Sequence, residues 1–155
     1  MSNFLLLPDE KKREYIFNAT LNIGLPPQSI EKVLWVTTIL QLVFSLPFAD
    51  KLVFKGGTSL SKVWNVIERF SEDIDLAIDR LNFGLEGDLT VRQLKKLRKQ
   101  SSLFVKEDFC DALQNALSQH GIQHLCTVEA EPDGKGDKRI LDLALEKLIS
   151  PLSLI

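Results

Sequence analysis

The sequence predicts an α+β domain in which a small mixed sheet is flanked by helices and preceded by N-terminal helices. Two observations carry this prediction. Apolar residues recur at helical spacing over most of the 155 residues, whereas two short stretches, LVF at 52–54 and IDLAI at 74–78, have the pattern of strands. A hydrophobic fraction of 45% and a charged fraction of 26% are ordinary for a globular chain that builds a core.

The N-terminal part, residues 1–48, is predicted to be helical. Asp9 can cap a first helix that Gly24 ends, and Ser29 can cap a second helix over residues 30–46, which Pro47 stops. The second helix is apolar on most sides, which is typical of a buried helix. Trp35 falls at core spacing within it, as Trp64 does in a later predicted helix.

The remainder, residues 49–155, is predicted to hold the sheet, in a single domain that spans residues 1–155. The order is a buried strand at 52–54, a glycine turn, a helix over 58–70 and a strand at 74–78. Thr90 and Gln93 match a capping box that opens a helix towards Lys99, and a further helix spans about 103–119. A strand at 123–130, a turn at 132–134 and a short amphipathic helix at 140–149 complete the chain.

Several function classes are disfavoured by composition. The net charge is −2, so any nucleic-acid contact must be local. Secretory signals and membrane-spanning stretches are missing from the pattern, which favours a cytoplasmic protein with no membrane association. Cys110 and Cys126 match no metal or redox spacing, and His120 and His124 are interpreted as loop residues.

A glycine pair directly follows the first strand. Glycine permits a positive φ and a close backbone approach, and the amides of Gly56, Gly57, Thr58 and Ser59 then lie at a helix N-terminus, where a phosphate can bind. The segment is neither a Walker loop nor a dinucleotide fingerprint. Taken alone, Gly-Gly is most often a plain tight turn.

Two aspartates open the second strand. Residues i and i+2 of a strand point to the same face, so Asp73 and Asp75 are expected to project side by side. Their mutual repulsion favours a divalent cation such as Mg²⁺, and metal-bound carboxylates support phosphoryl chemistry. A solvent-facing strand edge is the alternative. The strand–turn–helix–strand order would bring the glycine turn and the aspartates to one cleft, with cations and a hydroxyl nearby: Lys55, Lys62, Arg69 and Ser71.

The run FKGGTSLSKVWNVIERFSEDIDLAID resembles the nucleotidyltransferase toxins of the AbiEii/AbiGii type, from abortive-infection and type IV toxin–antitoxin systems. Their GG[TS]-x-L-x-K segment and their R-x-S-x-D-x-D segment are both complete here. The preceding IEKVLWVTTILQLVF is similar to the family's E-K-D-[YF]-W-V-T, with Val33 in place of the usual aspartate. The resemblance covers roughly residues 28–80.

The resemblance implies a minimal nucleotidyltransferase fold of the DNA polymerase β superfamily, and a transfer of a nucleotide from NTP to an acceptor, with RNA such as the tRNA 3′ end as the acceptor. It implies that Asp73 and Asp75 bind Mg²⁺ or Mn²⁺ and that a cognate antitoxin is the protein partner. Ser71 and Arg69 would lie at the active-site rim. The nucleotide would be bound by the glycine turn and the helix after it, through Gly56, Gly57, Thr58, Ser59 and Lys62.

The match to the family is weaker towards the C-terminus, where members supply a third carboxylate and a lysine-bearing region. Glu129 and Glu131 are candidates for that carboxylate, and a solvated edge strand is the alternative. The sequence therefore predicts a transferase with an altered or truncated C-terminal part, and leaves open a catalytically incomplete protein that binds a nucleotide or an antitoxin. A D-x-D glycosyltransferase is disfavoured because it needs no upstream Gly-Gly turn.

A basic stretch follows the second strand. Arg92, Lys95, Lys96 and Lys99 share one face of the predicted helix, and Arg98 and Lys106 add to its charge. This stretch could contact an RNA backbone. A solvated helix face is the alternative interpretation.

Overall fold

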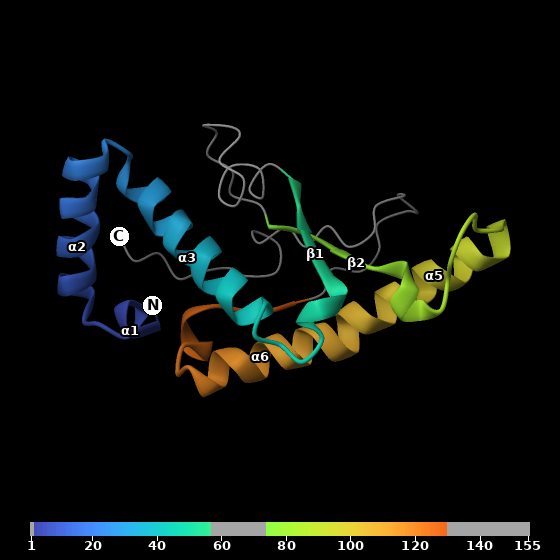
Figure 1. Cartoon of the computed structure of the whole chain (residues 1–155). Helices are drawn as coiled ribbons and strands as arrows, with labels where there is room; N and C mark the ends of the chain where they lie inside the picture. The colour runs from blue at the N-terminus through green and yellow to red at the C-terminus, as the bar shows by residue number, and fades with distance from the viewer. Residues whose placement is uncertain (1, 57–73, 130–155) are drawn as a thin grey trace.

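The computed structural model describes residues 2–56 and 74–129 (Figure 1). Within them the main elements, in chain order, are the helices α1 (Ser2–Leu5), α2 (Asp9–Ile23) and α3 (Pro27–Val43), the strands β1 (Leu52–Lys55) and β2 (Asp75–Ile78), and the helices α5 (Val91–Phe104) and α6 (Cys110–Gln119). Shorter helical turns are η1 (Ala49–Lys51), η2 (Arg80–Phe83), η3 (Val105–Phe109) and η4 (Gln123–Leu125). The predicted α+β class is confirmed.

Strands β1 and β2 pair antiparallel, with Leu52 opposite Ile78 and Lys55 opposite Asp75. Ile74, Leu76 and Ile78 are buried, so the alternation expected for the second strand is confirmed. The first strand differs from its prediction as a buried strand, because Val53 is exposed while Leu52 is buried. Within the described part of the chain, one face of the β1–β2 pair packs on the core.

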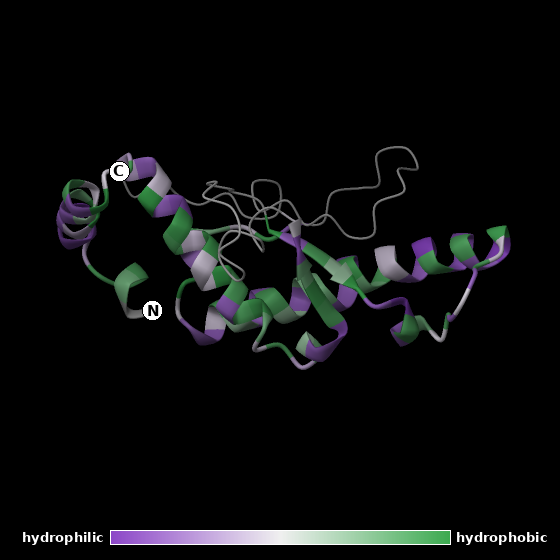
Figure 2. Cartoon of the chain, turned by 45° about the horizontal axis from the view of Figure 1, so that its top comes forward, coloured by the Kyte–Doolittle hydropathy of each residue, from purple (hydrophilic) through white to green (hydrophobic). Residues whose placement is uncertain are grey.

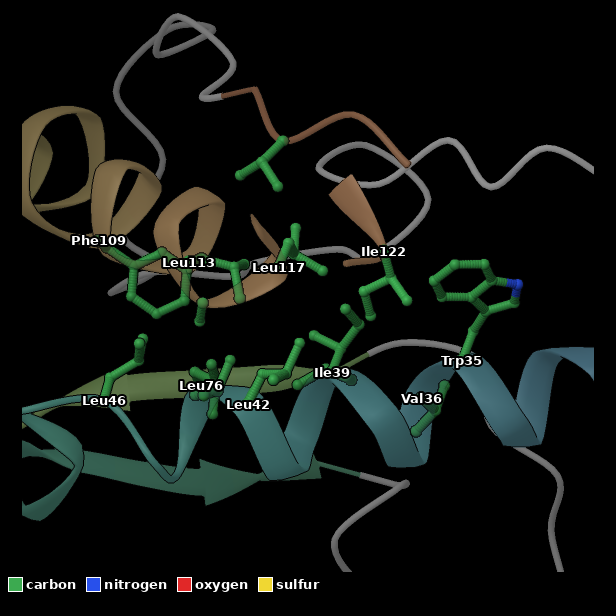
Figure 3. Packing of buried hydrophobic residues seen from close by; sticks show 14 of the residues in the cluster. Trp35, Val36, Ile39, Leu42, Leu46, Leu76, Phe109, Leu113, Leu117 and Ile122 are labelled. Carbon is green, nitrogen blue, oxygen red and sulfur yellow. The ribbon is translucent and has the colours of Figure 1, made fainter. Parts of the chain in front are cut away.

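Helix α3 and helix α6 sandwich the core together with the inner face of β2. Apolar side chains from these elements point toward one another in Figure 3, which labels Trp35, Val36, Ile39 and Leu42 from α3, Leu46, Leu76 from β2, Phe109, Leu113 and Leu117 near or on α6, and Ile122. The buried α3 and the core position of Trp35 agree with the sequence prediction. Trp64 lies outside the described residues.

The helix boundaries correct several sequence expectations. Asp9 is the first residue of α2 rather than its cap; it accepts a hydrogen bond from the Lys12 ammonium at 3.1 Å, and Gly24 ends the helix with a φ of 77°. Helix α3 begins at Pro27 and ends at Val43, so Ser29 lies in its first turn. Proline suits the first helical position because its missing N–H has no partner there in any case. Helix α1 has no counterpart in the sequence prediction.

Two predicted helices, one towards Lys99 and one over 103–119, form a single continuous rod. Helix α5 passes into the π-helical turn η3 and then into α6, and no proline or glycine interrupts the sequence between them. This long helix begins at the expected capping box. Thr90 Oγ1 accepts a hydrogen bond from the backbone N–H of Gln93 at 3.3 Å, and Gln93 Oε1 accepts one from the backbone N–H of Thr90 at 2.9 Å.

The strand predicted over 123–130 is wrong at its start, where residues 123–125 form the turn η4. Residue 128 makes an isolated bridge, and the Val128 carbonyl accepts from the Gln114 side chain at 3.1 Å. The buried side chains of Leu125 and Val128 explain the apolar pattern without a full strand. The elements predicted at 58–70, 132–134 and 140–149 lie outside the described residues.

Candidate functional site

The candidate site is built where β1 ends and β2 begins. Lys55 is the last residue of β1 and Asp75 the first of β2, and the register places them directly opposite each other. Because side chains alternate along a strand, both lie on the face opposite to that of Leu76 and Ile78, and each is half-buried. A cation and a carboxylate are therefore cross-strand neighbours, with Cβ atoms expected about 5 Å apart.

Gly56 follows Lys55 directly and has a φ of 79°, which side chains of L-residues rarely allow. The Asp75 carboxylate packs so closely against Gly56 that a Cβ at this position would overlap Oδ2 and lie only 2.6 Å from Cγ. Glycine is thus required at position 56 for two reasons: the positive φ, and the space that the Asp75 carboxylate fills. The first glycine of the turn and the second aspartate of the D-x-D pair are in contact.

The outward direction of Asp75 follows from burial of its neighbours. Ile74 and Leu76 are each 1% exposed, so their burial in the core turns the residue between them to the other face. Asp79, directly after the last residue of β2, is exposed and has a different use: its side chain accepts from the Leu81 amide at 2.9 Å and caps the turn η2. Of these two carboxylates, Asp75 is the one that lies against Gly56.

The other residues expected at the site, Gly57, Thr58, Ser59, Lys62, Arg69, Ser71 and Asp73, lie outside the described residues. Within residues 2–56 and 74–129, no three His, Cys, Asp or Glu side chains gather closely enough to hold a metal ion. Glu129 is exposed, and its role as a third carboxylate stays a prediction; Glu131 lies outside the described part. His120 and His124 are exposed and lie at the end of α6 and in η4.

Sequence reasoning placed Lys55 only in the neighbourhood of the site, whereas the structure pairs it with Asp75 in the register of the two strands. A signal for this pairing was present. If Leu52 and Phe54 face the core with Leu76 and Ile78, an antiparallel register places Lys55 opposite Asp75. Neither residue is isolated, because each makes a polar interaction in the structure.

Cys110 is part of the hydrophobic core, and Cys126 packs against it. Burial raises the pKa of the Cys110 thiol, with a smaller contribution from Asp111, and burial raises the pKa of Cys126 to about 11. Both are free thiols. A thiol with a raised pKa is a poor nucleophile, so these residues agree with the structural role expected from their spacing.

The antiparallel β1–β2 pair packs on helices on one face and has Gly56 against the Asp75 carboxylate, and the α+β architecture is consistent with a minimal nucleotidyltransferase fold. The model of the nucleotidyl transferase AbiEii toxin family, of the type IV toxin–antitoxin system, matches residues 40–151, and the chain belongs to this family. The chain is accordingly a nucleotidyltransferase of the toxin class, and the family implies a nucleotide substrate and a cognate antitoxin.

No curated protein and no solved structure matches the chain. Among the described residues, no helix is long and apolar enough to cross a membrane.

Proposed function

We propose that this chain transfers a nucleotide from an NTP to the 3′ end of an RNA, a tRNA in particular, in a reaction that requires Mg²⁺ or Mn²⁺. The observation that supports the proposal best is the contact between Gly56 and the Asp75 carboxylate. Backbone amides that could hold a phosphate and a carboxylate that could hold a metal are needed at one place, because a metal held there would neutralise the charge of the phosphates.

The donor set suits a hard divalent cation. Asp75 would contribute carboxylate oxygens from the start of β2, and any side chain at position 56 would overlap that carboxylate. Asp73, two residues earlier in the sequence, would supply the second carboxylate. When bound, the metal would neutralise charge on the triphosphate and on the attacking oxygen.

The chain's own residues would then orient the reaction. The hydroxyl oxygen of the acceptor forms a bond to the α-phosphorus, the bond from that phosphorus to the bridging oxygen breaks, and pyrophosphate leaves with the electron pair. The hydroxyl proton passes to a base or to water. The turn from Gly56 to Ser59 would hold the phosphates, with Lys62 and Arg69 as cations and Ser71 at the rim. Lys55, opposite Asp75, would add a positive charge at the same edge of the sheet.

The test is transfer of label from each α-labelled NTP to total tRNA, with Mg²⁺, Mn²⁺ or a chelator. The wild-type chain should label the RNA 3′ end, and the double variant Asp73→Asn with Asp75→Asn should lose at least about 10²–10³-fold in rate, since a metal supplies several kcal/mol of transition-state stabilisation. The matched control is Asp79→Asn, which removes a carboxylate from the end of the same strand and should keep transfer within a few-fold.

Three outcomes separate the alternatives. Equal loss in the double variant and in Asp79→Asn would overturn the assignment of the metal ligands. Transfer to a protein or to a small molecule instead of RNA would overturn the acceptor. NTP binding without turnover in any of the three metal conditions would show a nucleotide-binding protein and would overturn the proposed reaction.

A further inference from the structure

We infer that the outward face of α5 is the surface that holds the phosphate backbone of the RNA acceptor, through the side chains of Arg92, Lys95, Lys96 and Lys99. The inference deepens the proposed function and rests on it for the identity of the acceptor. It is carried by the exposure of these four cations, by their alignment on one side of the helix and by the position of α5 in the molecule.

The alignment follows from helix geometry. At about 100° per residue the four cations fall within an arc of about 100°, and successive members are at most about 5 Å apart along the axis. All four are exposed. Leu97 and Ser101 are buried and lie on the opposite side of the helix, so α5 is anchored by one side and presents the cations on the other.

The charge is concentrated on this helix. Five basic residues and no acidic residue lie within α5, although the whole chain has a net charge of −2, so the rest of the chain carries a net charge of −7. Because the chain is acidic overall, a basic helix face is a favoured place for a polyanion such as RNA to approach.

Helix α5 extends away from the candidate site at Asp75, so it could contact an RNA acceptor at some distance from the RNA 3′ end. Figure 1 shows α5 extending beyond the sheet, away from the N-terminal helices α2 and α3. The C-terminal end of α5 packs on the core. The Phe104 ring lies edge-on against the Phe48 ring, with 4.9 Å between centroids, and the Phe109 ring lies 6.1 Å from the Phe48 ring. The capping box stabilises the other end. The basic face is thus held on a continuous, anchored helix.

The route from the site to this face is short. Strand β2 begins at Asp75 and covers about 10 Å before the turn η2, which contacts α5. An RNA whose 3′ end lies at Asp75 therefore needs only a few nucleotides to reach the cations of α5. Figure 2 shows hydrophilic residues along α5 alternating with hydrophobic ones, as the two-sided character of the helix requires.

An acidic protein surface is the other polyanion that this face could bind, and the composition of the face favours RNA. Protein interfaces carry an apolar centre depleted in charged residues, especially lysine. Between Arg92 and Lys99 the basic arc contains no apolar side chain. The exposed Leu94 lies on the far side of the helix, and the exposed Leu103 lies one turn beyond Lys99, at the end of the row of cations. A row of cations without an apolar centre is typical of backbone contacts to a nucleic acid.

The experiment compares two triple variants of the full chain that remove the same charge. The first is Lys95→Gln with Lys96→Gln and Lys99→Gln, on the proposed face. The control is Lys11→Gln with Arg13→Gln and Lys51→Gln, all exposed and all outside α5. Glutamine keeps a helix propensity close to that of lysine, and circular dichroism checks that both variants are folded.

Binding of fluorescently labelled tRNA is measured against salt concentration. The α5 variant should bind about 10- to 100-fold more weakly at about 0.1 M salt, and the slope of log K against log salt should become shallower by about 2 to 3, because three phosphate contacts are lost. The control variant should keep a slope close to wild type. Equal slopes in both variants would overturn the inference.

Transfer kinetics distinguish this inference from the proposed function. The α5 variant should raise KM for tRNA and leave KM for NTP unchanged. Normal KM for tRNA in an active α5 variant would overturn the inference and leave the transferase intact. Absence of transfer in the wild type, together with α5-dependent RNA binding, would overturn the proposed reaction and keep the RNA surface. Loss of binding to the antitoxin with RNA binding intact would show a protein-binding face and would overturn the inference.

Discussion

The two faces of the β1–β2 pair differ in composition although they alternate along the same eight residues. The inner face presents Leu52, Phe54, Leu76 and Ile78 to the core, and the outer face presents Val53, Lys55, Asp75 and Ala77. Leu76 is 1% exposed and Val53 is 53% exposed, so the two faces have opposite environments. Residues of the inner face should therefore matter mainly for stability, and residues of the outer face mainly for activity, so substitutions on the two faces should have separable effects.

The largest expected difference is between Leu76→Ala and Asp75→Asn, at neighbouring positions of β2. Leu76→Ala should lower the free energy of unfolding by about 2–5 kcal/mol, because it leaves a cavity among packed side chains. Asp75→Asn should change it by about 1 kcal/mol or less, because the side chain lies on the outer face opposite Lys55.

Urea unfolding measures both stabilities, and labelling of tRNA measures activity at a temperature where both variants are folded. Leu76→Ala should then keep transfer within a few-fold, whereas Asp75→Asn should lose it. A similar loss of stability in both variants would contradict the division between the two faces.

A second comparison uses two glycines that share a backbone conformation. Gly24 has a φ of 77°, and nothing lies within 4 Å of the position that a Cβ would take there, whereas Gly56 has a φ of 79° and contacts the Asp75 carboxylate. Gly24→Ala should cost about 1 kcal/mol for the left-handed conformation alone. Gly56→Ala should cost about 1–3 kcal/mol and should also lower transfer, because the methyl group displaces the carboxylate.

Chemical denaturation of the two variants isolates the effect of the contact. The double variant Gly56→Ala with Asp75→Ala should recover part of the stability that Gly56→Ala loses, since the overlapping group is gone. An equal cost in Gly24→Ala and Gly56→Ala, with no recovery in the double variant, would refute the close approach.

The features that can be predicted from the sequence are those fixed by local pattern. The alternation Ile74–Ile78, the capping box at Thr90 and the buried apolar helix α3 each depend on side-chain period or on a local hydrogen bond. The contact of Gly56 with Asp75 requires the register of two strands that are far apart in the sequence, and a propensity argument does not supply a register.

Other differences have similar causes. The sequence predicts two separate helices here, but the π-helical turn η3 joins α5 to α6 and the helix continues. Residues 123–125 form a turn because Leu125 must reach the core next to α6, and the alternating pattern alone does not distinguish such a turn from a strand. In both places tertiary packing overrides the local signal.

The smallest expected effect concerns a thiol on the core side. The pKa of Cys126 is raised by burial from its ordinary value of 9.0 to about 11, so the folded chain keeps its proton where the unfolded chain loses it. The unfolded state therefore binds fewer protons between about pH 9 and pH 11, and the free energy of unfolding should fall as the pH rises through this window. Below about pH 9 the thiol should contribute no pH dependence.

Urea unfolding at about pH 8 and about pH 10 measures this fall in the wild type and in Cys126→Ala. The loss between the two pH values should be smaller in Cys126→Ala by under about 1 kcal/mol, since one pH unit corresponds to at most about 1.4 kcal/mol and Cys126 is only partly buried. Lysine and tyrosine titrate in the same range in both proteins, so the difference isolates the thiol. An identical pH dependence in the two proteins would mean that Cys126 does not share the environment of the inner face, although it packs against the same core as Leu76.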